Sequence, residues 1–215
     1  RTVTEPKEIA DVLDNHFSSV FQGETDNLPY FSSPLVSFRL ESVVFIEADI
    51  AERLAELDRT KSMGVDGIHP HVLRECSHAL AQPLVLIFSA SIRSASLPLA
   101  WRRANVTPIH KKGSRLEPSN YRPISLTSVV CKVMESIVRD SIMIHFHSNN
   151  LLASQQHGFV PRRACNTNLL ETVDLVTALM NEKKPIDIVF VDFAKAFDKV
   201  PHRRLLLKLR GLGIG

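Results

Sequence analysis

The stretch DIVFVDFAKAFDKV, Asp187 to Val200, decides how this 215-residue chain is interpreted. Four apolar residues, Ile188 to Val191, run directly into the carboxylate of Asp192, and an aromatic residue follows it. A continuous apolar run of this length is typical of a strand that is covered on both faces, as in the middle of a helix-backed sheet. We therefore expect a buried strand over residues 186–192, with Asp192 at its C-terminal end.

The charge of Asp192 needs an explanation, because an ionised carboxylate away from water requires a cation, hydrogen-bond donors or solvent. One explanation is structural: Asp192 caps a short helix or turn formed by Phe193 to Lys199. The other is chemical: Asp192 is a catalytic carboxylate. This stretch alone leaves both explanations open.

The composition is that of an ordinary globular protein, with 44% hydrophobic and 23% charged residues. The chain is long enough to bury one sizeable core or two small ones. The net charge is only +3. Any surface that binds nucleic acid must therefore come from an uneven distribution of charge.

The three cysteines are widely spaced and odd in number, which favours reduced intracellular thiols over a disulfide framework. Cys76 and His78 have no second pair at the spacing of a zinc site. No signal peptide is recognisable, and no apolar stretch reaches the roughly 18 residues of a membrane span. We expect a soluble intracellular protein that does not cross a membrane.

Hydrophobic periodicity predicts a mostly helical chain with one hairpin. Helices are expected over 8–21, 47–59, 127–147, 167–180 and 201–209, with two more between the loop 61–70 and residue 98. Pro83 is expected in the first turn of the second of these. Residues 22–42 should form a linker, and 104–113 with 121–126 a hairpin.

A single central strand cannot form a sheet that is covered on both faces. The sequence therefore predicts that the partner strands of residues 186–192 lie after Gly215 or on another chain.

Basic residues gather on the predicted hairpin. Between Trp101 and Arg122 six cations stand against the single acid Glu117, and they are Arg102, Arg103, Lys111, Lys112, Arg115 and Arg122. A guanidinium holds a phosphate through two parallel hydrogen bonds, and lysines add point charge, so Lys111, Lys112 and Arg122 suit a polyphosphate. A solvated charged hairpin without a ligand is the alternative.

Five collinear segments resemble the reverse transcriptase of non-LTR retrotransposons, the long interspersed element type. They are KSMGVDGIHPHVL, WRRANVTPIHKKG, NYRPISLTSVVCKVMESIV, QHGFVPRRACNTNLL and IVFVDFAKAFDKVPH. Together they cover roughly Lys61 to Gly215. The fold implied is α+β: a right-hand polymerase fragment with mostly helical fingers, a basic β-hairpin, and the first strand and helix of the palm.

The resemblance implies roles for individual residues. Asp192 matches the first catalytic, metal-binding carboxylate, and the backbone carbonyl of Phe193 matches a second oxygen ligand of Mg²⁺. Phe197 matches the side chain under the incoming sugar, where a ring excludes a 2′-hydroxyl; core packing is its alternative role. Asp198 more often supports the turn than touches metal.

The nucleotide and template contacts follow from the other motifs. Arg122, with Lys111 or Lys112, matches the residues that hold the incoming triphosphate. Gln156, Gly158 and Phe159 are expected to shape the template path, where a glycine permits close backbone approach. The implied partners are an RNA template, a DNA primer and deoxynucleoside triphosphates.

The chain departs from the family where the chemistry is centred. No aromatic-x-Asp-Asp sequence, which carries the second palm carboxylates, occurs in the 215 residues. Two Mg²⁺ ions assist nucleotidyl transfer in the complete enzyme, and one matched carboxylate would bind Mg²⁺ weakly or not at all. We therefore expect a fragment that lacks the rest of the palm and the thumb and is inactive alone.

The expected organisation is an N-terminal helical segment and linker over 1–60, the fingers over 61–185, and the start of the palm over 186–215. The resemblance places such an enzyme in the nucleus or in ribonucleoprotein particles. One rival interpretation is a non-catalytic module that binds nucleic acid through the basic hairpin. Another is a decayed element whose product does not fold stably.

Overall fold

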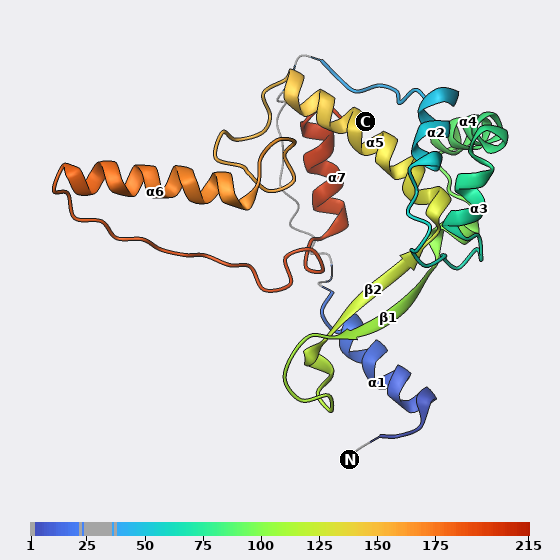
Figure 1. The fold of residues 1–215 in the computed structure, drawn as a ribbon, viewed down its shortest axis with the longest axis horizontal. Coiled ribbons are helices and arrows are strands. Elements are labelled where there is room, and N and C mark those ends of the chain that lie inside the picture. Colours follow the sequence, from blue (N-terminus) through green and yellow to red (C-terminus); the bar gives the residue numbers. More distant parts are fainter. Residues whose placement is uncertain (1–2, 22, 24–35, 37) are drawn as a thin grey trace.

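The structure is a computed structural model that describes residues 3–21, 23, 36 and 38–215. In this part of the chain the fold is a set of helices and one two-stranded antiparallel sheet (Figure 1). The elements are α1 (Pro6–Ser18), α2 (Glu47–Ala55), α3 (Pro70–Glu75), α4 (Ser77–Ser94), η1 (Leu99–Arg102), β1 (Ala104–His110), η2 (Pro118–Asn120), β2 (Tyr121–Thr127), α5 (Val129–Ser148), α6 (Cys165–Asn181) and α7 (His202–Gly211). This mixed content confirms the α+β class.

The hydrophobic core lies where α2, α3, α4 and the first half of α5 meet (Figure 1). The Phe88 ring on α4 is fully buried and contacts the rings of Phe45 and Trp101, with centroids 5.4 and 5.8 Å apart. The buried members of the core are Phe45, Ile50, Ala51, Leu54, Leu73, Ala81, Leu84, Phe88, Val129, Val130, Val133, Met134 and Ile137. The spacing of the last five places them on one face of α5, as the helical periodicity predicted.

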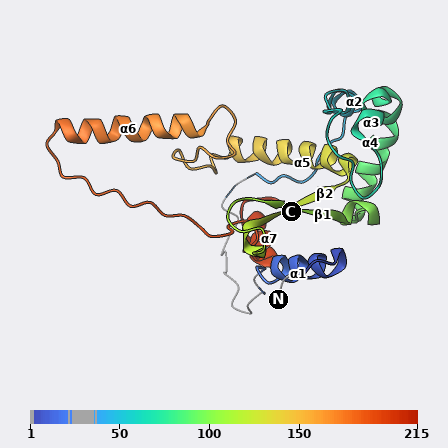
Figure 2. The same ribbon diagram turned by 60° about the horizontal axis from the view of Figure 1, so that its bottom comes forward.

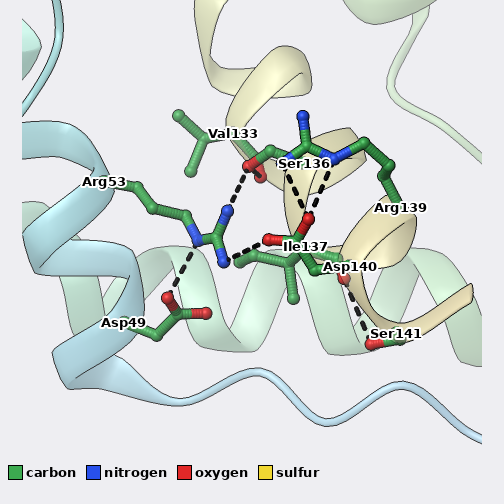
Figure 3. Close-up of polar contacts among 8 residues, drawn as sticks. All are labelled: Asp49, Arg53, Val133, Ser136, Ile137, Arg139, Asp140 and Ser141. Carbon is green, nitrogen blue, oxygen red and sulfur yellow. Dashed lines mark hydrogen bonds and ion pairs between the residues drawn. The ribbon is translucent and has the colours of Figure 1, made fainter. Parts of the chain in front are cut away.

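A polar clamp of Asp49, Arg53, Ser136 and Asp140 joins α2 to α5 beside this core (Figure 3). The Arg53 guanidinium donates hydrogen bonds to Asp49 Oδ1, Ser136 Oγ and Asp140 Oδ2, each 2.9 Å long. Arg139 also donates to the Asp140 carboxylate. A guanidinium carries donors in a fixed fork, so this set of acceptors fixes the rotation of α2 against α5.

The start of α5 is set by Ser128, whose Oγ accepts a hydrogen bond from Cys131 N. Directly before it, the backbone of Thr127 at the end of β2 passes against Gly64, where any Cβ would overlap that backbone. Gly67, in the same loop, has a φ of +69°. The loop 61–70 therefore uses both glycines: Gly64 allows close approach and Gly67 an αL backbone.

The predicted hairpin is confirmed. β1 and β2 pair antiparallel with Ala104 opposite Thr127 and His110 opposite Tyr121. Lys111 N donates to Asn120 O at 2.8 Å, which carries the ladder one pair further. The connecting loop contains η2, and α1 packs against η2 at this end of the hairpin (Figure 1).

α6 projects away from the rest of the molecule, and both views show this (Figures 1 and 2). None of its residues is buried. The chain then returns through residues 183–193 in an irregular, extended course to α7. The C-terminal residues lie against the end of α5, where the ring of His145 is 2.7 Å from Leu212 O and Leu40 N donates to Gly213 O.

Several sequence expectations are corrected. Residues 186–192 form no strand and are not buried; Phe190 is 89% exposed. The physical reason is that a strand needs a neighbour for its N–H and C=O groups, and no other strand lies beside this segment in the part of the chain that the structure describes.

Two helix expectations also change. Pro83 lies inside α4 rather than in its first turn, because α4 already begins at Ser77. The helix expected over 47–59 ends at Ala55, where Glu56 is its C-cap. The predicted linker over 22–42 lies mostly outside the described residues.

Candidate functional site

The basic hairpin presents its cations to solvent. Lys111, Lys112 and Arg122 are all exposed. Ile109 stands opposite Arg122 in the register, so these two side chains share a face of the hairpin. Lys111 follows Ile109 by two residues and extends from the same face, whereas Lys112 lies in the bend beyond the ladder. The alternation along the strand therefore places Lys111, rather than Lys112, on the face of Arg122.

None of the six cations between Arg102 and Arg122 forms an ion pair with a residue that the structure describes. The tip of the hairpin is instead held by neutral contacts. Asn120 Nδ2 donates to Ser114 O at 2.9 Å, and the Tyr121 hydroxyl donates to Arg115 O at 2.9 Å. The positive charge is thus available to an anionic ligand.

Asp192 lies at the exposed end of the extended segment, directly before a turn over residues 194–199. Lys199 N donates to Lys195 O at 3.1 Å, and Val200 N donates to Phe197 O at 3.3 Å. Among the described residues no backbone N–H of this turn donates to the Asp192 side chain, so the N-cap explanation is wrong for this structure. The carboxylate of Asp192 faces solvent.

The predicted template residues lie in the loop between α5 and α6. Gln156 Nε2 donates to Gly158 O at 2.9 Å. A Cβ added to Gly158 would approach only Gln156 Nε2, at an ordinary 3.6 Å, so no part of the described chain requires glycine there. Phe159 has a φ of +61° and is 87% exposed. A bulky side chain in the αL region is uncommon and costs backbone strain.

The structure brings two of these segments together. The rings of Phe159 and Phe197 meet edge to face, with centroids 6.0 Å apart and an interplanar angle of 85°. Phe197 is 79% exposed, so it does not pack in a core as the alternative for this residue required. By contrast, no hydrogen bond or ion pair among the described residues joins the hairpin cations to the Asp192 turn.

Sequence reasoning missed two residues that organise the loop. His157 is buried, and its ring contacts Thr167 and Glu171 on α6. Arg163 donates from Nη1 to the carbonyls of Ser154 and Gln156. No periodicity marks a loop residue, so the only available signal was the position of both residues inside the motif QHGFVPRR.

A metal site is not formed by the described residues alone. No group of three or more His, Cys, Asp or Glu side chains lies close enough together among them to hold a metal ion. Asp192 is the one matched carboxylate, and hard cations such as Mg²⁺ need several oxygen ligands. The residues present therefore do not fit a pair of Mg²⁺ ions, and we derive no catalytic step through them.

The family model described as reverse transcriptase (RNA-dependent DNA polymerase) matches residues 109–215. Residues 109–215 belong to the reverse transcriptase family. The matched span begins in β1 and includes Lys111, Arg122, the loop of Gln156 and the turn of Phe197. Every residue to which the sequence analysis gave a role therefore lies in the reverse transcriptase part of the chain.

Curated relatives extend the similarity over most of the chain. The chain is 28% identical to a probable RNA-directed DNA polymerase from transposon BS of Drosophila melanogaster over 182 residues. This alignment covers 84% of the chain and 19% of that protein. The chain is 27% identical over 218 residues to the RNA-directed DNA polymerase from mobile element jockey of Drosophila funebris, covering 99% and 24%. The expected similarity to non-LTR reverse transcriptases is confirmed.

The chain spans about a fifth to a quarter of the length of these relatives. Among the described residues, no helix is both long and apolar enough to cross a membrane.

Proposed function

We propose that this chain is the fingers, residues 61–185, and the first part of the palm, residues 186–215, of an RNA-directed DNA polymerase from a retrotransposon. The observation that carries the proposal is the family match over residues 109–215, which contains all the predicted site residues in collinear order. Residues 1–60 are an N-terminal helical segment and linker in this proposal. By resemblance we place the protein inside the cell, in the nucleus or in a ribonucleoprotein particle.

The hairpin supplies the contact to the incoming triphosphate in this proposal. Arg122 and Lys111 share a face and have no acidic partner among the described residues. Charge-assisted hydrogen bonds to phosphate oxygens are short and about twice as strong as neutral ones. Lys112, in the bend, adds charge from the tip of the hairpin.

The sugar and the template are contacted by the second group of residues. The ring of Phe197 lies under the incoming sugar, and Gln156, Gly158 and Phe159 line the template path. The edge-to-face contact of Phe159 with Phe197 supports this assignment, because it places the two proposed contacts next to each other.

The metal centre is completed outside these residues in our proposal. Asp192 and the carbonyl of Phe193 supply oxygen ligands of the hard type that Mg²⁺ prefers. In a completed site these oxygens would help to hold Mg²⁺, which would supply Lewis acidity for nucleotidyl transfer. The further carboxylates that such a site needs are absent from the 215 residues.

The pure 215-residue chain should therefore not extend a primer. The test is Mg²⁺-dependent extension of a DNA primer on an RNA template, with a complete reverse transcriptase as the positive control. Incorporation above background that disappears in Asp192→Asn would show that the chain assembles a working site and would refute the inactivity. Incorporation that persists in Asp192→Asn would identify a contaminating polymerase.

A second candidate function is a non-catalytic module that binds nucleic acid through the hairpin. The six exposed cations without an ion pair among the described residues favour it. Binding through phosphate contacts alone weakens steeply with salt and does not depend on a metal ligand. Fluorescence anisotropy of a labelled single-stranded RNA across a salt series tests this candidate: affinity that falls steeply with salt and is unchanged in Asp192→Ala would support it.

A further inference from the structure

His157 is the most enclosed polar side chain of the α5–α6 loop, with a side-chain exposure of 4%. Its Nδ1 lies 2.8 Å from Thr167 Oγ1, and its Nε2 lies 3.1 Å from Glu171 Oε2. Both partners are on α6, in its first two turns. A buried polar group is costly unless it is hydrogen-bonded, and here both ring nitrogens have a partner. Because an ionised carboxylate only accepts, Nε2 donates to Glu171.

Thr167 connects this histidine to the start of α6. Its Oγ1 donates to Ala164 O at 2.7 Å and accepts from Ala164 N at 3.0 Å. Ala164 is the N-cap position of α6 and has no side chain that could bond the free N–H groups there. The hydroxyl of Thr167 therefore closes the helix start and holds the His157 ring at the same time.

Arg163 holds the part of the loop that precedes His157. Its guanidinium bonds the carbonyls of Ser154 and Gln156, on the side of the loop that precedes His157. His157 and Arg163 together fix both arms of the loop to each other and to α6. Gln156 and Phe159, which are both exposed, lie on either side of the His157 anchor.

We propose that His157 is a positioning residue: by bonding Thr167 and Glu171 it fixes the loop 156–163 on α6 and so sets the place of Gln156 and Phe159 for the template. The link between this anchor and a template rests on the proposed function. The anchoring itself rests on the hydrogen bonds alone. His157 touches neither substrate nor metal in this proposal and acts only through its neighbours.

Hydrogen–deuterium exchange of the 215-residue chain tests the anchoring. Two matched pairs of variants separate the hydrogen bonds from side-chain volume: Thr167→Val against Thr167→Ser, and Glu171→Ala against Glu171→Gln. We expect exchange in peptides spanning 154–164 to rise roughly tenfold in Glu171→Ala, as one lost buried hydrogen bond predicts, and to rise at least as much in Thr167→Val, which loses the contacts to both His157 and Ala164. Ser and Gln keep the acceptor atoms and should remain close to the original chain.

The reference is the exchange of α5, which should not change in any variant. Asp174→Ala, an exposed change on α6, serves as the matched control. Equal exchange in the Val and Ser variants, with equal exchange in the Ala and Gln variants, would overturn the anchoring role of His157.

Binding of a fluorescein-labelled single-stranded RNA tests the link to the template. We expect Thr167→Val to weaken binding as much as Phe159→Ala does, while Thr167→Ser retains the original affinity. If the loop loosens in Thr167→Val and RNA affinity is unchanged, the positioning for a template is overturned although the anchor stands. If the original chain binds no RNA, the proposed function fails, and the exchange experiment still decides the anchor.

Discussion

At the scale of single residues, the site depends on which side chains share a face of the hairpin. Arg122 and Lys111 do so because the β1–β2 register places them on one side of the ladder. Loss of either residue should therefore affect triphosphate binding more than loss of a cation elsewhere.

We predict that Arg122→Ala weakens binding of a deoxynucleoside triphosphate by about 1.5 to 3 kcal/mol, the contribution of a hydrogen bond to a charged group. Arg122→Lys should recover part of this, because lysine keeps the charge but loses the bidentate fork. Lys111→Ala should weaken binding more than Lys112→Ala. Isothermal titration calorimetry measures all four variants, with the exposed Arg93→Ala on α4 as the control. Equal losses in the Arg122 and Arg93 variants would contradict a specific contact.

The burial of one cysteine, Cys131, should make the three thiols differ in reactivity. Cys131 is 2% exposed on α5, and burial, with the neighbouring Glu135 carboxylate, raises the pKa of its thiol to about 12. Only the thiolate reacts, so Cys131 should be inert at pH 8. Cys76 and Cys165 are exposed. A thiol reagent should therefore titrate two groups in the native chain and the third only after unfolding; three equally fast groups would disprove the burial of Cys131.

At the scale of elements, the Arg53 clamp determines how α2 sits on α5. Partial burial opposes ionisation of Asp140, but hydrogen bonds from Arg139 and Arg53 outweigh it and hold the pKa of this carboxyl below its usual value. A carboxyl with a lowered folded-state pKa stabilises the fold above its ordinary pKa. That contribution is lost as the pH falls through the folded-state value.

We predict that Arg53→Ala lowers the free energy of unfolding by about 1 kcal/mol, because three acceptors on two helices lose a partly exposed partner. Urea denaturation at pH 7 measures this. The effect should shrink as the pH falls below about 4, the ordinary range of an aspartate. Arg59→Ala removes an exposed ion pair with Glu75 and should change stability by less than about 0.5 kcal/mol. A loss from Arg53→Ala that is independent of pH would argue against the role of Asp140.

At the scale of the whole molecule, stability is unevenly distributed. The core lies around α2 to α5, whereas α6 has no buried residue and residues 186–193 expose a row of apolar side chains. Segments with few buried contacts open at little cost in free energy. The molecule therefore combines a packed core with a long arm that has little packing of its own.

We predict that limited trypsin digestion cuts after Lys183, Lys195 or Lys199 well before it cuts within α2 to α5. These lysines are exposed and lie outside helices and strands. Mass spectrometry of the early fragments identifies the cuts. First cuts within the core helices would instead support the interpretation that the chain does not fold stably.

The sequence by itself predicted the elements whose formation is local. The helical spacing predicted α5, and two extended runs around a basic turn predicted the hairpin. The motifs that match the reverse transcriptase family were likewise visible in the residues alone. These signals survive without tertiary context because they depend on neighbours within a few positions.

Only the tertiary structure decided which distant residues meet. The apolar run before Asp192 predicted a buried strand, but a strand exists only where another strand offers its N–H and C=O groups, and none does so among the described residues. The ring contact of Phe159 with Phe197, the three bonds of Arg53 and the anchor of His157 on α6 follow from the path of the chain in space. Sequence periodicity reports which face of an element a residue occupies, whereas the partner opposite that face is set by the packing of the whole fold.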